Sequence, residues 1–162
     1  MRISILLAAA ATLLLAACAK DPAPTPTVAT KAAEPLVLHL QAIAGLNPGA
    51  NGLPAPVRVR LYELKNAAVF ARADYFALAD HAQATLGSDL LDRDEVLVQP
   101  GEYRKVTRQL NPATRQLGLV VGYRALDQAL WRDVITVAPG AGGELQISLD
   151  VNAVRSAAVV TP

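Results

Sequence analysis

Three short segments of this chain alternate apolar and polar residues, and this alternation constrains the fold more than any other feature. The segments are residues 36–41, 57–62 and 145–151. A period of two is that of a β-strand with one buried face, because successive side chains point to opposite faces. Within the second segment, Val59 and Leu61 are therefore expected to face the interior. Arg58 and Arg60, at the alternate positions, are expected to face solvent.

Further short strands separated by turn residues indicate an all-β fold. Residues 117–123 are apolar on both faces, which is typical of an inner strand, and glycines there mark places where a large side chain comes close. Weaker alternation predicts strands at residues 95–98, 103–110 and 134–137. Pairs such as Pro100-Gly101 separate these segments as turns. The pattern predicts an antiparallel β-sandwich.

One segment breaks the period of two. Residues 67–84 carry apolar residues close to helical spacing among many alanines. Asn66 is a suitable N-cap, and the segment is expected to end near Gly87. The pattern predicts one or two short helices laid against the sandwich by Phe70 and Phe76. A second helical turn is predicted at residues 126–130.

The N-terminus has the features of a lipoprotein signal peptide. Arg2 supplies the positive charge, and the apolar run at residues 5–17 is too short to span a bilayer of about 30 Å. Leu15-Ala16-Ala17-Cys18 fits the lipobox, in which the thiol receives diacylglycerol and cleavage exposes the acylated cysteine. The alternative is an ordinary signal peptide followed by a free cysteine. The sequence predicts a bacterial lipoprotein with a covalent lipid at Cys18 and no other cofactor.

The residues after the cysteine divide the mature chain. Ala19 stands where an aspartate would signal retention in the inner membrane, so anchoring in the outer membrane, facing the periplasm, is expected. Residues 18–35 contain four prolines and no apolar period, which predicts an extended, lipidated tether. With the signal peptide at residues 1–17, this leaves a β-sandwich domain at residues 36–151 and a C-terminal tail at residues 152–162.

Charge and cysteine content exclude several classes of protein. The chain has 15 Lys and Arg against 14 Asp and Glu, so loss of Arg2 with the signal leaves 14 against 14. A neutral mature chain lacks the basic footprint of a nucleic-acid binder. Its only cysteine is the predicted lipid site, so no disulfide can form within the domain. Core packing and hydrogen bonds must therefore stabilise it.

No catalytic constellation is evident. His39 and His81 have polar neighbours but no partner in a known motif, and the serines stand in no nucleophile motif. The acidic segment of Asp89, Asp92, Asp94 and Glu95 lacks calcium-loop spacing, so a solvated loop is favoured and an ion site stays open. Trp131, beside Arg132, is expected in the core. The sequence predicts a protein that is not an enzyme.

Several blocks of sequence, taken in order, resemble the TssJ family of type VI secretion lipoproteins. They are Leu46-Asn47, Gly52 with Pro54, PVRVRLYEL at 56–64, FARADYFAL at 70–78, LGSDLL at 86–91, Pro100-Gly101, and GLVVGYR at 118–124 running on to Trp131-Arg132. The blocks cover nearly the whole mature domain. The tether and the residues after Val151 carry no family signal.

The resemblance implies a transthyretin-like β-sandwich with a small helical insertion and a non-enzymatic role. Members of the family lie on the periplasmic side of the outer membrane and bind the periplasmic C-terminal part of TssM, which also engages TssL. In the family, the loop between the first two strands is implicated in holding TssM. That loop corresponds here to residues 44–55. The main rival is an outer-membrane lipoprotein that binds a small molecule or peptidoglycan, and a third possibility is a periplasmic enzyme.

The composition of this loop suits a binding role. Its glycines, asparagines and prolines cannot continue a strand, and loops of about a dozen residues are often functional. The predicted contacts with TssM are Leu46, Asn47, Pro48, Gly49, Asn51, Gly52 and Leu53. The alternative is a hairpin connection whose leucines pack on the core. If the loop binds, replacing residues 46–53 with glycine and serine should keep the fold and weaken the binding.

Overall fold

Eight strands and one α-helix make up the part of the chain that the structure, a computed structural model, describes: residues 34–138 and 142–159. The strands are β1 (Leu36–Ala42), β2 (Val57–Leu64), β3 (Leu90–Val98), β4 (Tyr103–Arg108), β5 (Gln116–Val121), β6 (Arg132–Thr136), β7 (Gly143–Leu149) and β8 (Val154–Ala158). The helix is α1 (Tyr75–Leu86), and two short 3-10 helices are η1 (Gly87–Asp89) and η2 (Leu126–Gln128). The predicted signal peptide and Cys18 lie outside the described residues.

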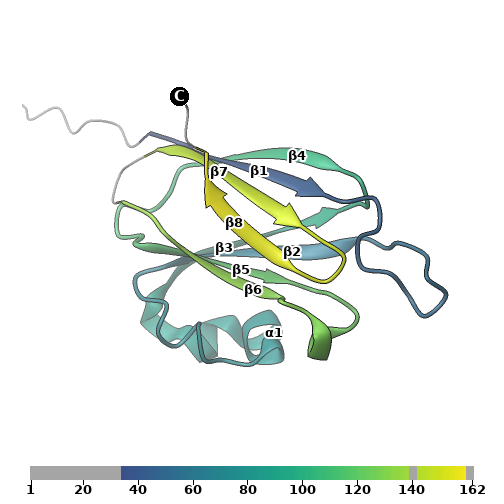
Figure 1. Ribbon diagram of the computed structural model, residues 1–162. Coiled ribbons are helices and arrows are strands. Elements are labelled where there is room, and N and C mark those ends of the chain that lie inside the picture. Colours follow the sequence, from purple (N-terminus) through teal and green to yellow (C-terminus); the bar gives the residue numbers. More distant parts are fainter. Residues whose placement is uncertain (1–33, 139–141, 160–162) are drawn as a thin grey trace, which may run out of the picture. The chain divides into compact units, whose positions relative to one another are not determined.

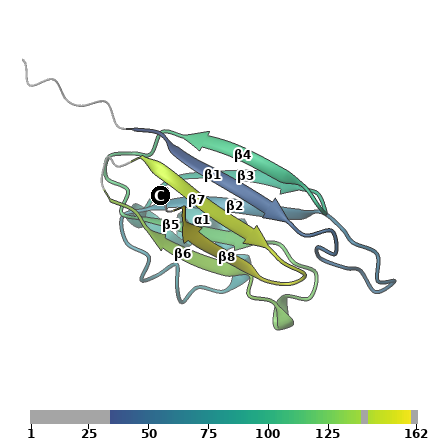
Figure 2. The ribbon, with the colours of Figure 1, turned by 45° about the horizontal axis from the view of Figure 1, so that its top comes forward.

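The strands form two four-stranded sheets that pack face to face (Figures 1 and 2). One has the order β4-β1-β7-β8 and the other the order β3-β2-β5-β6. The predicted β-sandwich with a small helical insertion is confirmed. One pair, β1 with β7, is parallel. The chain leaves β1 for the other sheet and returns to β7 much later, so no tight turn forces those two strands to run in opposite directions.

The apolar faces of the two sheets form the main core. Val59 and Leu61 of β2 are buried, Arg58 is exposed, and Arg60 lies on the outer face, as the alternation predicts. Trp131 is half-buried and packs on the edge of this core.

The helical insertion covers the outer face of the β3-β2-β5-β6 sheet (Figure 1). A Cβ at Gly118 would lie 2.4 Å from the Phe70 ring, so the phenylalanine packs directly on the sheet backbone. Phe76, expected to pack in the same way, is instead 62% exposed.

The helix begins later than the sequence predicts. The side chain of Asp74 caps it by accepting the Ala77 N–H at 2.9 Å, whereas Asn66 caps only a turn. The Arg132 guanidinium donates to the carbonyls of Phe70 and Ala73, at 2.9 and 2.8 Å. These hydrogen bonds link the turns that precede the helix to β6. The predicted end near Gly87 and the helical turn after residue 125 are both confirmed.

The acidic segment predicted as a loop is a strand from residue 90 onward. It forms the edge strand β3, which pairs with β2 along its length. Asp92 and Asp94 both form ion pairs with Arg108 of β4, whose positive charge lowers the repulsion between them. Charged residues are favoured on edge strands because they oppose pairing with other chains. Across the described ranges, no cluster of side chains could hold a metal ion.

The sandwich continues past Val151, where the sequence predicts that it ends. β8 pairs antiparallel with β7, and Val154 is buried opposite Leu149. The Ser156 hydroxyl donates to Asp133 of β6, which ties this edge to the other sheet. The strand reads V-R-S-A-A, and small alanines carry too little apolar alternation to predict it. The prediction that a C-terminal tail begins at residue 152 is therefore wrong, because β8 belongs to the sandwich.

Candidate functional site

The connection from β1 to β2, residues 43–56, crosses between the sheets and projects from one end of the sandwich (Figure 1). Its base is buried. Leu46 is 0% exposed and belongs to the main core. Asn47 is 4% exposed and has a φ of 50°, in the left-handed region that asparagine tolerates better than most residues.

Asn47 ties the loop to two other parts of the fold and to its own far end. Its Oδ1 accepts the Arg124 N–H at 2.8 Å, after β5. Its Nδ2 donates to the Pro56 carbonyl at 3.1 Å, and its own N–H donates to the Val151 carbonyl at 2.9 Å. The path of the loop at this point is therefore fixed by long-range hydrogen bonds.

The tip of the loop, residues 48–53, is ordered by hydrogen bonds within itself. The Gly49 N–H donates to the Leu53 carbonyl and the Gly52 N–H to the Gly49 carbonyl, both at 2.9 Å. The Asn51 side chain accepts the Leu53 N–H at 3.1 Å, and Gly52 has a φ of 73°. The Leu53 side chain is 63% exposed. The tip thus presents an apolar side chain from a turn that is already formed.

Two further connections lie at the same end of the sandwich, those joining β5 to β6 and β7 to β8 (Figure 1). A hollow of about 150 Å³ lies between them and the loop, lined by Asn47, Pro48, Tyr123, Ala125, Gln128, Val151 and Asn152. Ile43, Leu130 and Val151 are also exposed at this end, by 39%, 59% and 43%. This combination of a hollow and exposed apolar side chains is typical of an interaction surface.

Tyr123 lies at this hollow and in the main core. Its hydroxyl is buried without a hydrogen-bond partner among the described residues. Burial, and secondly the carboxylate of Asp150, raise the pKa of this hydroxyl far above its usual range. Tyr123 therefore remains neutral at any physiological pH.

The seven predicted contact residues fall into two groups. Pro48, Asn51, Gly52 and Leu53 are exposed and Gly49 is half-buried, so these five remain predicted contacts. Leu46 and Asn47 are buried in the base, although Asn47 also lines the hollow, and contact of either residue with TssM stays a prediction. Of the two leucines left open by the sequence, Leu46 packs on the core and Leu53 does not.

Three exposed apolar residues at this end, Ile43, Leu130 and Val151, are not among the contacts predicted from the sequence. They come from three connections that are far apart in the sequence, so no local motif groups them. The only signal was a large apolar residue close after the end of a strand or helical turn.

His39 is more enclosed than the sequence suggests, because β1 is an inner strand. Its side chain is 14% exposed, with Nε2 2.9 Å from a Glu144 carboxylate oxygen and Nδ1 2.5 Å from the Tyr103 hydroxyl. The three residues come from neighbouring strands of one sheet. The contacts among these three side chains stabilise the pairing of the strands.

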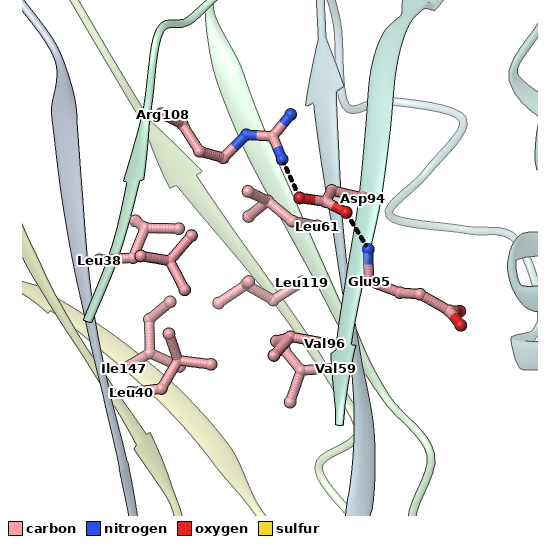
Figure 3. A pocket seen from close by; sticks show the side chains of 11 residues that line it. Leu38, Leu40, Val59, Leu61, Asp94, Glu95, Val96, Arg108, Leu119 and Ile147 are labelled. Atoms are coloured by element: carbon pink, nitrogen blue, oxygen red, sulfur yellow. Dashed lines mark hydrogen bonds and ion pairs between the residues drawn. The ribbon is translucent and has the colours of Figure 1, made fainter. Parts of the chain in front are cut away.

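A small cavity lies between the two sheets, behind Arg108 and Asp94 (Figure 3). It is lined mainly by aliphatic side chains, among them Leu38, Leu119 and Ile147. Its volume is about 30 Å³, whereas sites for small molecules usually measure roughly 300 to 1,000 Å³. The interior therefore offers no room for an apolar small molecule.

A family model for type VI secretion lipoproteins, described as VasD, EvfM, TssJ and VC_A0113, matches residues 34–153. The chain belongs to this TssJ family. The lipoprotein TssJ1 from Pseudomonas aeruginosa is 49% identical in sequence, and the match covers 80% of this chain and 98% of TssJ1 with a TM-score of 0.76. No curated protein sequence matches the chain significantly.

Two further solved structures contain chains similar to this TssJ-family member. One is described as a type VI membrane complex; its chain is 28% identical, with coverage of 80% and 98% and a TM-score of 0.67. The other is described as the TssM C-terminal domain from EAEC; its matching chain is 28% identical, with coverage of 78% and 99% and a TM-score of 0.63.

Membership places the chain among the structural lipoprotein components of the secretion system. The TssJ family is not a known enzyme family and has no known cofactor. Membership supports a membrane-associated lipoprotein with a role in the type VI membrane complex. Within the described residues, no helix has the length and apolar character needed to cross a bilayer.

Proposed function

We propose that this TssJ-family chain is anchored in the outer membrane by the lipid on Cys18 and binds the periplasmic C-terminal region of TssM. Through TssM it would be joined indirectly to TssL. Similarity to chains in structures described as a type VI membrane complex and as a TssM C-terminal domain supports TssM as the partner. The observation that carries the choice of site is the exposed tip of the β1–β2 loop on its buried base.

The tip has the properties of a contact that binds without first having to become ordered. Its backbone is held by its own hydrogen bonds, and its base is fixed by Asn47. A preordered loop loses little conformational entropy on binding, so more of the contact energy appears as affinity. Leu53 is the largest apolar side chain on the tip and is the expected anchor.

Leu53→Ser is expected to weaken binding of the TssM periplasmic domain by about tenfold or more, since about 1.4 kcal/mol of lost contact suffices. Phe76→Ser on α1 is the matched control, because Phe76 is 62% exposed against 63% for Leu53. Calorimetry with the mature chain and the TssM domain measures both. A loss with Phe76→Ser and none with Leu53→Ser would move the site to the helical insertion.

Cys18→Ser is expected to shift the chain from the outer-membrane fraction to the soluble periplasm or to leave it as unprocessed precursor. Acyl chains anchor through burial of methylene groups, each contributing about 0.8 kcal/mol. Density-gradient fractionation and labelling with palmitate test this. A wild-type chain that incorporates no label would contradict the lipid anchor, and label recovered in the inner membrane would contradict the sorting.

A further inference from the structure

A polar cleft lies on the outer face of the β3-β2-β5-β6 sheet, beside α1, which covers only part of that face. It measures about 570 Å³, within the usual range for ligand sites. It is lined by Arg58, Arg60 and Tyr62 of β2, by Arg93, Asp94 and Glu95 of β3, and by Ala79 and Asp80 of α1. None of these residues belongs to the loop proposed to bind TssM.

The three arginines of this cleft have most of their hydrogen-bond donors unused. Arg60 donates once, to the Tyr75 hydroxyl at 3.2 Å, although its side chain is only 15% exposed. Among the described residues, Arg58 and Arg93 donate no side-chain hydrogen bond. Arg108, on the interior side of β4, is the contrast, because its guanidinium contacts three carboxylates.

The carboxylates at the cleft do not use up these donors. Glu95 lies 3.4 Å from one nitrogen of Arg58 and 3.4 Å from one nitrogen of Arg60, and neither contact has hydrogen-bond geometry. The Asp94 side chain turns to the other face of the sheet to pair with Arg108, whereas Glu95 points away from that face (Figure 3). Asp80, on the α1 side, is the remaining carboxylate.

We infer that this cleft binds an extended acidic peptide with carboxylates at alternate positions. Arg58 and Arg60 are two residues apart on one strand, so their side chains repeat every ~7 Å on the same face. Carboxylates at alternate positions of an extended peptide have the same repeat. Guanidinium groups bind carboxylates with two parallel hydrogen bonds, and Arg93 on the neighbouring strand supplies a third such group.

The probe is a fluorescently labelled Glu-Ser-Glu-Ser-Glu peptide, titrated by anisotropy into the mature chain carrying Cys18→Ser. Saturable binding is expected, at least threefold tighter than for Glu-Glu-Glu-Ser-Ser, which has the same composition and charge. Arg60→Gln is expected to weaken binding tenfold or more. Glu95→Gln is expected to tighten it severalfold, because it removes the carboxylate that competes for both arginines.

Arg155→Gln, on β8 of the other sheet, is the matched control and should leave the affinity unchanged. Arg93→Gln provides a second test if Arg60→Gln lowers the melting temperature, since Arg93 is exposed. Absence of saturable binding, equal affinity for the two peptides, or displacement by inorganic phosphate at equal ionic strength would each overturn the proposal. Leu53→Ser should not affect the peptide, so this result and the TssM result can fail separately.

Discussion

The base and the tip of the β1–β2 loop have similar compositions and opposite environments. Each contains a leucine and an asparagine, with glycine and proline as close neighbours in the sequence. Leu46 of the base is 0% exposed, whereas Leu53 of the tip is 63% exposed. Asn47 bonds to Arg124, to Val151 and to Pro56 at the far end of the loop, whereas the hydrogen bonds of the tip close within residues 48–53.

This difference shows how a rigid binding loop is built. Loops that bind must be exposed, yet an exposed loop without support is mobile and loses entropy on binding. Here a buried leucine and a buried amide hold the base, so the tip is presented on a fixed support. Substitutions in the base should therefore act first on stability, and substitutions in the tip first on binding.

The largest expected effect is that of Leu46→Ala, which should lower the free energy of unfolding by about 2–5 kcal/mol, as other buried large-to-small changes do. Leu53→Ala is the control and should change it by less than about 0.5 kcal/mol, because that side chain is mostly exposed. Chemical denaturation of the mature chain measures both. Equal losses of stability would mean that the tip and the base contribute equally to the fold.

Asn47→Ala should lower the free energy of unfolding by a smaller amount, about 1–3 kcal/mol. It leaves the Arg124 N–H and the Pro56 carbonyl without partners and places alanine at a φ of 50°. Asn47→Gly separates the two causes, because glycine tolerates the backbone angle but restores neither hydrogen bond. If Asn47→Gly were as stable as the wild type in the same denaturation experiment, the hydrogen bonds would contribute nothing.

Most strands could be predicted from the sequence because their period is local. Val59 and Leu61 alternate with arginines, and the structure places each on the expected face. Gly118 could likewise be read as a point of close approach, which Phe70 makes. The exceptions are strands whose stability comes from partners elsewhere in the chain. β3 carries acidic residues that pair with Arg108 of β4, and two of the five residues of β8 are alanine.

The loop could be located from its composition and from the family resemblance, but its division into base and tip could not. Leu46 and Leu53 have the same kinds of neighbours in the sequence. What distinguishes them is Asn47, whose partners lie 9 and 77 residues away. Burial that depends on such distant contacts leaves no local signal. The sequence alone therefore predicted contacts across both parts.

The smallest expected effect is that of replacing only the tip, residues 48–53, with glycine and serine at equal length. Closure of a flexible loop depends weakly on its length, by about 0.6 kcal/mol per doubling, and no core side chain is removed. The melting temperature should therefore stay close to that of the wild type, while binding to TssM weakens. The longer replacement of residues 46–53, which the sequence alone predicts to keep the fold, also removes Leu46 and Asn47 and should unfold at a clearly lower temperature. Paired melting curves of the two replacements measure this difference. Coincident curves would mean that the base does not support the fold, and the assignment of separate roles to base and tip would then be wrong.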